Sequence, residues 1–168
     1  MKRTRKAIYI LMLLLGMSNS IRAQNEVSQK FIVGLRGGLS FAPTDWSFSE
    51  INIFPSIGIA TSCNISKSPL YLETGLYYTN RYVSGSANHS LLVPALLTYH
   101  IPSRSNKSIQ PFAGPFISYG FDEAAIDGGI RLGIGFNSSN FYINCGYDLS
   151  MSYGVDEDAL FINIGYNL

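Results

Sequence analysis

Two histidines, His89 and His100, are the residues of this sequence best suited to general-base or metal chemistry. Such chemistry needs a partner side chain within hydrogen-bond reach of the imidazole. We identify no such partner for either histidine and interpret both as surface side chains. The sequence therefore predicts a protein that is not an enzyme, with no catalytic residue, no metal site and no cofactor.

A set of five charged residues forms the other candidate site: Arg36, Glu73, Asp127, Arg131 and Asp148. They stand, together with Arg81, in stretches that are otherwise rich in Gly, Ser and Asn. Such charges could line an aqueous pore, or they could pair with one another inside a closed interior. The choice between these roles depends on the elements that position the side chains.

Four stretches of the chain alternate at a period of two, which is the pattern of a β-strand with two unlike faces. The last is the clearest, because Leu160, Ile162 and Ile164 alternate with less apolar positions such as Asn163 and Gly165. Four further stretches fit the pattern less clearly. The eight predicted strands are 31–40, 53–65, 70–81, 91–101, 109–120, 129–136, 141–149 and 160–168.

The composition favours a membrane setting for these strands. Charged residues make up only 14% of the sequence, and the polar phase of the strands carries many of its 16 glycines. A narrow barrel has little interior room, and glycine lets its strands bend where the sheet closes. Each stretch is close to the roughly 9–11 residues of a tilted membrane strand. We therefore predict an all-β fold, a transmembrane antiparallel up-and-down β-barrel of about eight strands, with a soluble periplasmic β-protein as the alternative.

The connectors between the predicted strands fall into two alternating sets. The first contains 66–69, 102–108 and 138–139, and the second contains 41–52, 82–90, 121–126 and 151–158. The first set is mostly the shorter, as periplasmic turns are in outer-membrane barrels. The second set is then expected to form the outer loops, and both chain ends are expected on the periplasmic side.

The first 23 residues resemble a secretory signal peptide. Basic residues within the first six positions precede an apolar run over 7–16 that is too short to span a bilayer as a helix, and a polar stretch with small residues follows. We expect cleavage after Ala23, with a site near Ser20 as an alternative and an uncleaved anchor as the competing interpretation. The barrel domain would then cover 24–168, with a net charge of about −4 and no basic stripe for nucleic acid.

Four motifs support a more specific resemblance. They are Val33 to Ser40, the Pro-centred Leu91 to Tyr99, the Gly-Pro segment Phe112 to Phe116, and the Gly-rich Asp127 to Gly135. In this order they resemble strands of the PorT-like outer-membrane β-barrel proteins of Gram-negative bacteria. The resemblance covers nearly all of 31–168 and implies a single barrel in the outer membrane. It implies no particular activity, although some relatives serve protein secretion.

The predicted barrel gives the charged residues a geometry. A hairpin turning at Ser138 and Ser139 would set Arg131 diagonal to Asp148 on the inward face, with Asp127 able to share the same cation. Arg36 and Glu73 would extend this network towards the periplasmic end. About eight strands leave room only for side chains, so we favour a packed network over a pore lining.

The cysteines are expected to remain unbridged in this arrangement. Cys63 and Cys145 fall in the apolar phase of strands that are not neighbours in a simple meander. A disulfide requires Cα atoms within about 7 Å of each other. Both residues are interpreted as small lipid-facing side chains.

The functional prediction is a non-enzymatic, monomeric outer-membrane barrel with a structural or interaction role in the cell envelope. Its expected partner is outer-membrane lipid, and an envelope protein that contacts the outer loops is a further candidate. A small pore for ions or solutes is the first alternative, and an accessory component of protein secretion is the second.

Overall fold

The computed structural model describes residues 31–43, 51–65, 68–83, 86–103, 107–122, 124, 126–151 and 158–168. The strands are β1 (Phe31–Pro43), β2 (Ile51–Asn64), β3 (Leu70–Val83), β4 (Ser86–Tyr99), β5 (Ile101–Ser103), β6 (Lys107–Gly120), β7 (Ile126–Ser138), β8 (Phe141–Ser150) and β9 (Ala159–Asn167). No helix in these ranges is long and apolar enough to cross a bilayer. The predicted signal peptide, residues 1–23, lies outside the described residues.

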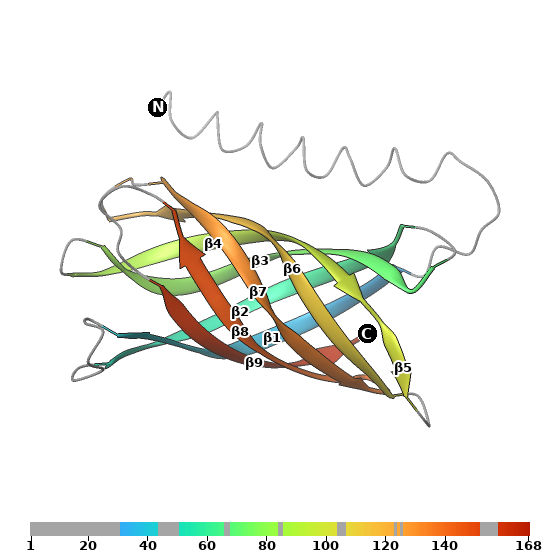
Figure 1. Cartoon of the computed structure of the whole chain (residues 1–168). Coiled ribbons are helices and arrows are strands. Elements are labelled where there is room, and N and C mark those ends of the chain that lie inside the picture. Colours follow the sequence, from blue (N-terminus) through green and yellow to red (C-terminus); the bar gives the residue numbers. More distant parts are fainter. Residues whose placement is uncertain are drawn as a thin grey trace.

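The strands form one closed antiparallel sheet. Their order is β4-β3-β2-β1-β9-β8-β7-β6-β5, and β4 also pairs with β6, which closes the barrel (Figure 1). β4 and β5 are two parts of one barrel strand, interrupted at His100, and both pair with β6. We call each of the eight strands of the barrel a stave, so that β4 and β5 together form one stave. The predicted eight-stranded up-and-down barrel is therefore confirmed, and a closed sheet leaves no edge strand to be covered.

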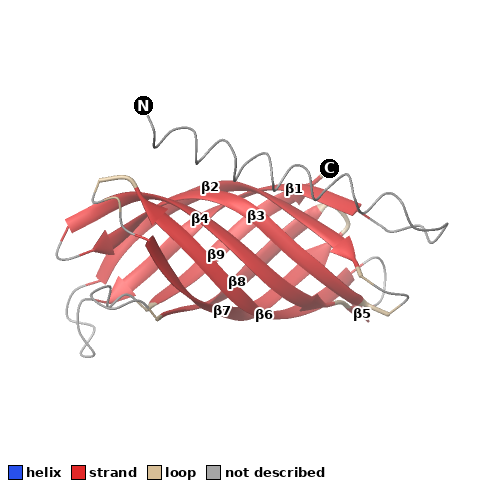
Figure 2. Ribbon diagram, turned by 90° about the horizontal axis from the view of Figure 1, so that it is seen from above, coloured by secondary structure: helices blue, strands red, loops and turns tan. Residues whose placement is uncertain are grey.

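The staves tilt and wrap around a common axis, as Figure 2 shows from a second direction. Both described chain ends lie at one rim, where the Leu168 amide donates to the Val33 carbonyl at 2.8 Å. The short connection between β7 and β8 also lies at this rim, because the Asn167 amide donates to the Asn140 carbonyl. We call this the terminal rim, and the other end the distal rim.

Two predicted loops at the distal rim are shorter than expected. β1 runs to Pro43, and β3 and β4 continue until only 84–85 separate them. The predicted loop over 82–90 is therefore mostly strand. Asn88 and Ser90 are polar but fully buried inside the barrel. The sequence here therefore lacks the apolar alternation that marks a strand, although the backbone continues to pair with β3. Between β6 and β7, residues 121, 122 and 124 are described, whereas residues 152–157 between β8 and β9 lie outside the described residues.

The two faces of the sheet differ as the alternation predicts. Outward side chains are large and apolar, such as Ile57 and Ile164, which are 67% and 54% exposed. Inward positions carry buried polar residues and a few small apolar clusters, one of them Leu96, Phe112 and Phe161. This is the reverse of a soluble sandwich, where apolar residues collect inside.

The β7–β8 hairpin has a different register from the one predicted. Its turn is Ser139 and Asn140, between paired Ser138 and Phe141. Arg131 therefore lies directly opposite Asp148, not diagonal to it, and Gly129 faces Ser150. The partner of each residue moves by two positions, so every side chain stays on its predicted face.

Candidate functional site: the charged barrel interior

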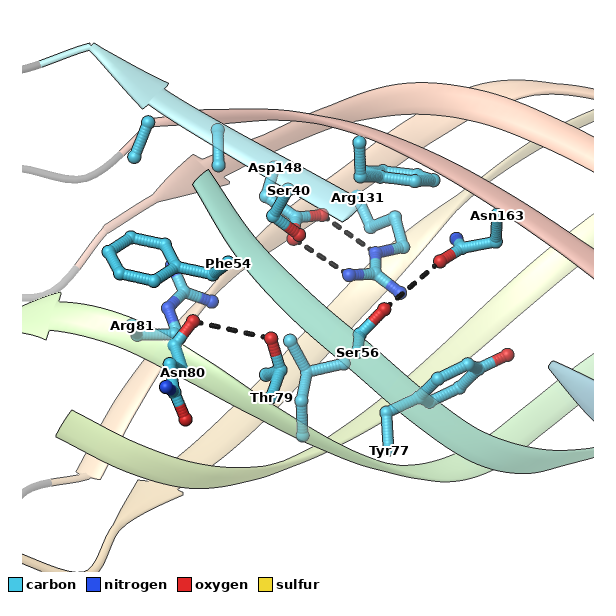
Figure 3. A pocket seen from close by; sticks show the side chains of 14 residues that line it. Ser40, Phe54, Ser56, Tyr77, Thr79, Asn80, Arg81, Arg131, Asp148 and Asn163 are labelled. Atoms are coloured by element: carbon cyan, nitrogen blue, oxygen red, sulfur yellow. Dashed lines mark hydrogen bonds and ion pairs between the residues drawn. The ribbon is translucent and has the colours of Figure 1, made fainter. Parts of the chain in front are cut away.

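The interior ion pair of Arg131 and Asp148 joins neighbouring strands β7 and β8. The Arg131 Nε and Nη2 donate to the two Asp148 carboxylate oxygens, each at 2.7 Å, and both residues are buried (Figure 3). The guanidinium carbon also lies 4.4 Å from the ring centroid of Phe161 and 5.9 Å from that of Tyr77. This bidentate geometry fixes the plane of the guanidinium as well as its position.

A second ion pair lies nearer the distal rim. Arg81 Nη2 is 3.1 Å from Asp127 Oδ2, and the Ser150 hydroxyl donates to Asp127 Oδ1 at 2.8 Å. Arg81 also lies over the Phe116 ring at 5.0 Å. The expectation that Asp127 shares the cation of Arg131 is wrong. The ion-pair partner of Asp127 is Arg81 on β3, and that of Arg131 is Asp148.

A chain of hydrogen bonds between uncharged side chains runs from the middle of the barrel towards the terminal rim. Ser56 Oγ donates to Asn163 Oδ1 at 3.2 Å, Asn163 Nδ2 to Asn144 Oδ1 at 2.9 Å, and Asn144 Nδ2 to the Tyr142 hydroxyl at 3.1 Å. The Tyr142 ring then supports Arg36, whose guanidinium carbon lies 4.2 Å from its centroid. The sequence did not indicate this chain, because no local pattern connects asparagines on adjacent strands.

Arg36 and Glu73 occupy the same half of the interior. Arg36 Nη2 donates to Asn167 Oδ1 at 2.7 Å. Glu73 is buried and, among the described residues, forms no direct ion pair; its electrostatic partners are Arg36 and Arg131. All five residues of the predicted set thus lie in the interior, but only Arg131 and Asp148 pair with each other. Asp127 pairs with Arg81, Arg36 bonds to Asn167, and Glu73 interacts with Arg36 and Arg131 through their charges alone.

The comparisons with known proteins concern the fold. Neisserial surface protein A is 13% identical with a TM-score of 0.58, and the match covers 84% of this chain and 99% of that one. Ail, the attachment invasion locus protein of Yersinia pestis, is 14% identical with a TM-score of 0.54, covering 84% and 100%. The chain has the fold of a small outer-membrane β-barrel. No family model and no curated protein match the sequence, so the PorT-like likeness stays a resemblance of motifs.

In this small outer-membrane-type barrel, the cavity beside the Arg131–Asp148 pair is small. A cavity of about 20 Å³ borders Arg81 and the Arg131–Asp148 pair, together with Ser40, Ser56 and other inward residues (Figure 3). That volume holds about one water molecule. At this level of the barrel, charged and aromatic side chains therefore occupy most of the lumen.

The two histidines lie at opposite rims. His89, on β4, is exposed, and its Nδ1 lies 2.8 Å from the Tyr78 hydroxyl and 2.9 Å from Asn80 Oδ1. His100 stacks on Tyr71, with ring centroids 3.8 Å apart. The described residues contain no group of three His, Cys, Asp or Glu side chains that could hold a metal ion. The sequence did not reveal the neighbours of either histidine, because in both cases they come from a paired strand.

Proposed function

We propose that this protein resides in the outer membrane as a non-enzymatic barrel with a closed interior. Its role is structural, or lies in presenting its distal rim to a partner in the cell envelope. The support for the location is the fold together with the apolar outward face of every stave. The predicted contact surface for another envelope protein lies in the distal connectors, largely outside the described residues.

The main support for a closed interior is the packing of the Arg131–Asp148 pair, because the Arg131 guanidinium lies against the rings of Phe161 and Tyr77. In addition, three buried arginines are balanced by three buried carboxylates, which are Glu73, Asp127 and Asp148. Paired charges that are buried away from water leave no hydrated path for an ion. Because their signs balance, they also create no net field that would attract an ion into the barrel. This arrangement supports a packed barrel over the pore alternative.

Conductance in planar bilayers tests the closed interior. We expect no stable single-channel steps from the refolded wild-type protein. The control is the variant with Arg131→Ala, Asp148→Ala and Phe161→Ala, which removes the ion pair and the ring packed against it. Vesicle flotation first shows that this variant inserts into the bilayer, and it should then conduct. Reproducible steps from the wild type would favour the pore alternative.

The proposed location has its own experiment. Fractionation of the native cells should place the protein in the outer membrane, and N-terminal sequencing of the extracted chain should begin at Gln24. A chain that begins at Met1 or is released in soluble form by osmotic shock would contradict the export argument. Comparison of envelope lipids in cells with and without the protein tests the non-enzymatic role, and comparison of their secreted proteins tests the secretory alternative.

A further inference from the structure

Six exposed or half-exposed residues gather on the outward face near the distal rim, across β3, β4 and β6. They form two adjoining rows: Tyr78, Leu91 and Tyr119 in one, and Asn80, His89 and Phe121 in the other. The Phe121 amide donates to the His89 carbonyl at 2.8 Å, which continues the pairing beyond the end of β6. We call these six residues, with the adjacent Asp122, the rim patch.

The polar members of the rim patch hold one another in place. The His89 Nδ1 lies within 2.9 Å of both the Tyr78 hydroxyl and Asn80 Oδ1. The His89 backbone amide donates to Asp122 Oδ2 at 2.9 Å. Two neighbours at one imidazole nitrogen fix the ring and leave the other nitrogen, Nε2, for a ligand.

The aromatic members of the rim patch form a platform beside this polar group. Tyr119 and Phe121 meet edge to face, with centroids 5.7 Å apart and planes at 85°. They are 42% and 47% exposed, and Tyr78 is 45% exposed. The position of the patch, outward and near a rim, is where lipid headgroups meet a barrel.

We propose that the rim patch binds the saccharide headgroup of an outer-leaflet glycolipid, a role that rests on the proposed outer-membrane location. A pyranose ring presents C–H faces, which pack on aromatic rings, and vicinal hydroxyls, which both donate and accept hydrogen bonds. The patch offers rings together with an imidazole, an amide, phenols and a carboxylate. None of its members is Lys or Arg, so it lacks the groups that recognise a phosphate, and sugar hydroxyls are the better match.

The test compares the melting temperature of the full barrel in two kinds of nanodisc. One contains phosphatidylethanolamine and phosphatidylglycerol alone, and the other contains the same lipids with lipopolysaccharide. The glycolipid should raise the melting temperature of the wild type. His89→Phe, which keeps a ring but removes both nitrogens, and Phe121→Ala should each lose most of that rise. Tyr166→Ala, an exposed outward tyrosine on β9, is the matched control and should keep it.

A direct readout accompanies the melting data. The His89 imidazole resonances should shift when lipopolysaccharide is present and stay unchanged in phospholipid alone. Equal wild-type melting temperatures in the two kinds of nanodisc would overturn the proposal. So would a Tyr166→Ala variant that loses as much of the rise as His89→Phe and Phe121→Ala do. Because fractionation reports the location separately, a barrel found in the outer membrane without these effects would contradict this inference alone.

Discussion

Each interior arginine lies against an aromatic ring as well as near an oxygen acceptor: Arg36 on Tyr142, Arg81 on Phe116, and Arg131 on Phe161. The ring face attracts the cation, and this attraction grows when both groups are shielded from water. Guanidinium groups suit such places because they are flat and weakly hydrated. The interior therefore gains rigidity from charges that would be costly if left alone.

The first prediction concerns the Arg131–Asp148 pair. Arg131→Leu should destabilise the barrel, by about 3–5 kcal/mol if no water enters, because Asp148 would remain charged without a partner. Arg131→Leu combined with Asp148→Leu should recover part of the loss. The free energy of unfolding by guanidinium in lipid vesicles measures both. An Arg131→Leu barrel as stable as the wild type would show that the pair contributes no stability.

The second prediction compares two glycines on β7 that face opposite ways. A Cβ on inward Gly133 would contact the Cys145 carbonyl oxygen and come within 2.6 Å of Phe112 Cζ, whereas on outward Gly128 the nearest atom would be 3.5 Å away. Gly133→Ala should therefore cost about 1–3 kcal/mol through overpacking, and Gly128→Ala should be close to neutral. Urea unfolding of the two variants checks the difference. Equal losses would mean that close packing against the interior is not the cause.

At the scale of elements, β4 shows how proline shapes the sheet. The β3–β4 pairing lapses at Pro94 and resumes at Tyr77 with Leu92, and the β4–β6 pairing lapses opposite Pro115. Proline has no amide hydrogen to give to the ladder. The Thr74 hydroxyl donates to the Pro94 carbonyl at 2.7 Å, which adds a side-chain bond where the ladder is weakest.

The third prediction tests the β7–β8 turn. Ser139 has a φ of 57°, in the left-handed region that costs a non-glycine residue about 1–2 kcal/mol. Ser139→Gly should therefore stabilise the barrel slightly, after allowing for the greater flexibility of glycine in the unfolded chain. Ser139→Pro should destabilise it, since proline cannot adopt this φ. Unfolding free energies of both variants measure the effect; a stabilising proline would contradict the turn.

At the scale of the whole molecule, closure of the sheet into a barrel is the main source of resistance to unfolding. Because every stave pairs with two neighbours, opening the barrel breaks many hydrogen bonds at once, and lipid offers the freed groups no partners. The fourth prediction is that the protein stays folded in cold detergent and changes its electrophoretic mobility only after boiling. A single mobility before and after boiling would count against a closed barrel.

The fifth prediction uses the strand order. Cys63 on β2 and Cys145 on β8 have β1 and β9 between them. Both thiols should therefore react with a labelling reagent under denaturing, non-reducing conditions. A mass lower by two hydrogens with no reactive thiol would require a different strand order.

The sequence by itself determined the staves and their two faces. Period-two alternation marks a strand wherever one face is apolar, so the clear strands and the inward placement of Arg36, Glu73 and Asp148 followed from it. The pattern failed where both faces are polar, as in the first residues of β4. It also could not fix the β7–β8 register, since a shift of two residues preserves every face.

Only the tertiary structure decided which interior groups meet. Arg81 reaches Asp127 because closure brings β3 and β7 across a narrow lumen, and Asn163 and Asn144 bond because β8 and β9 are adjacent. The rim patch likewise depends on β3, β4 and β6 lying side by side. Local periodicity shows the face on which a side chain lies, whereas its partner depends on register and closure, which the whole chain sets together.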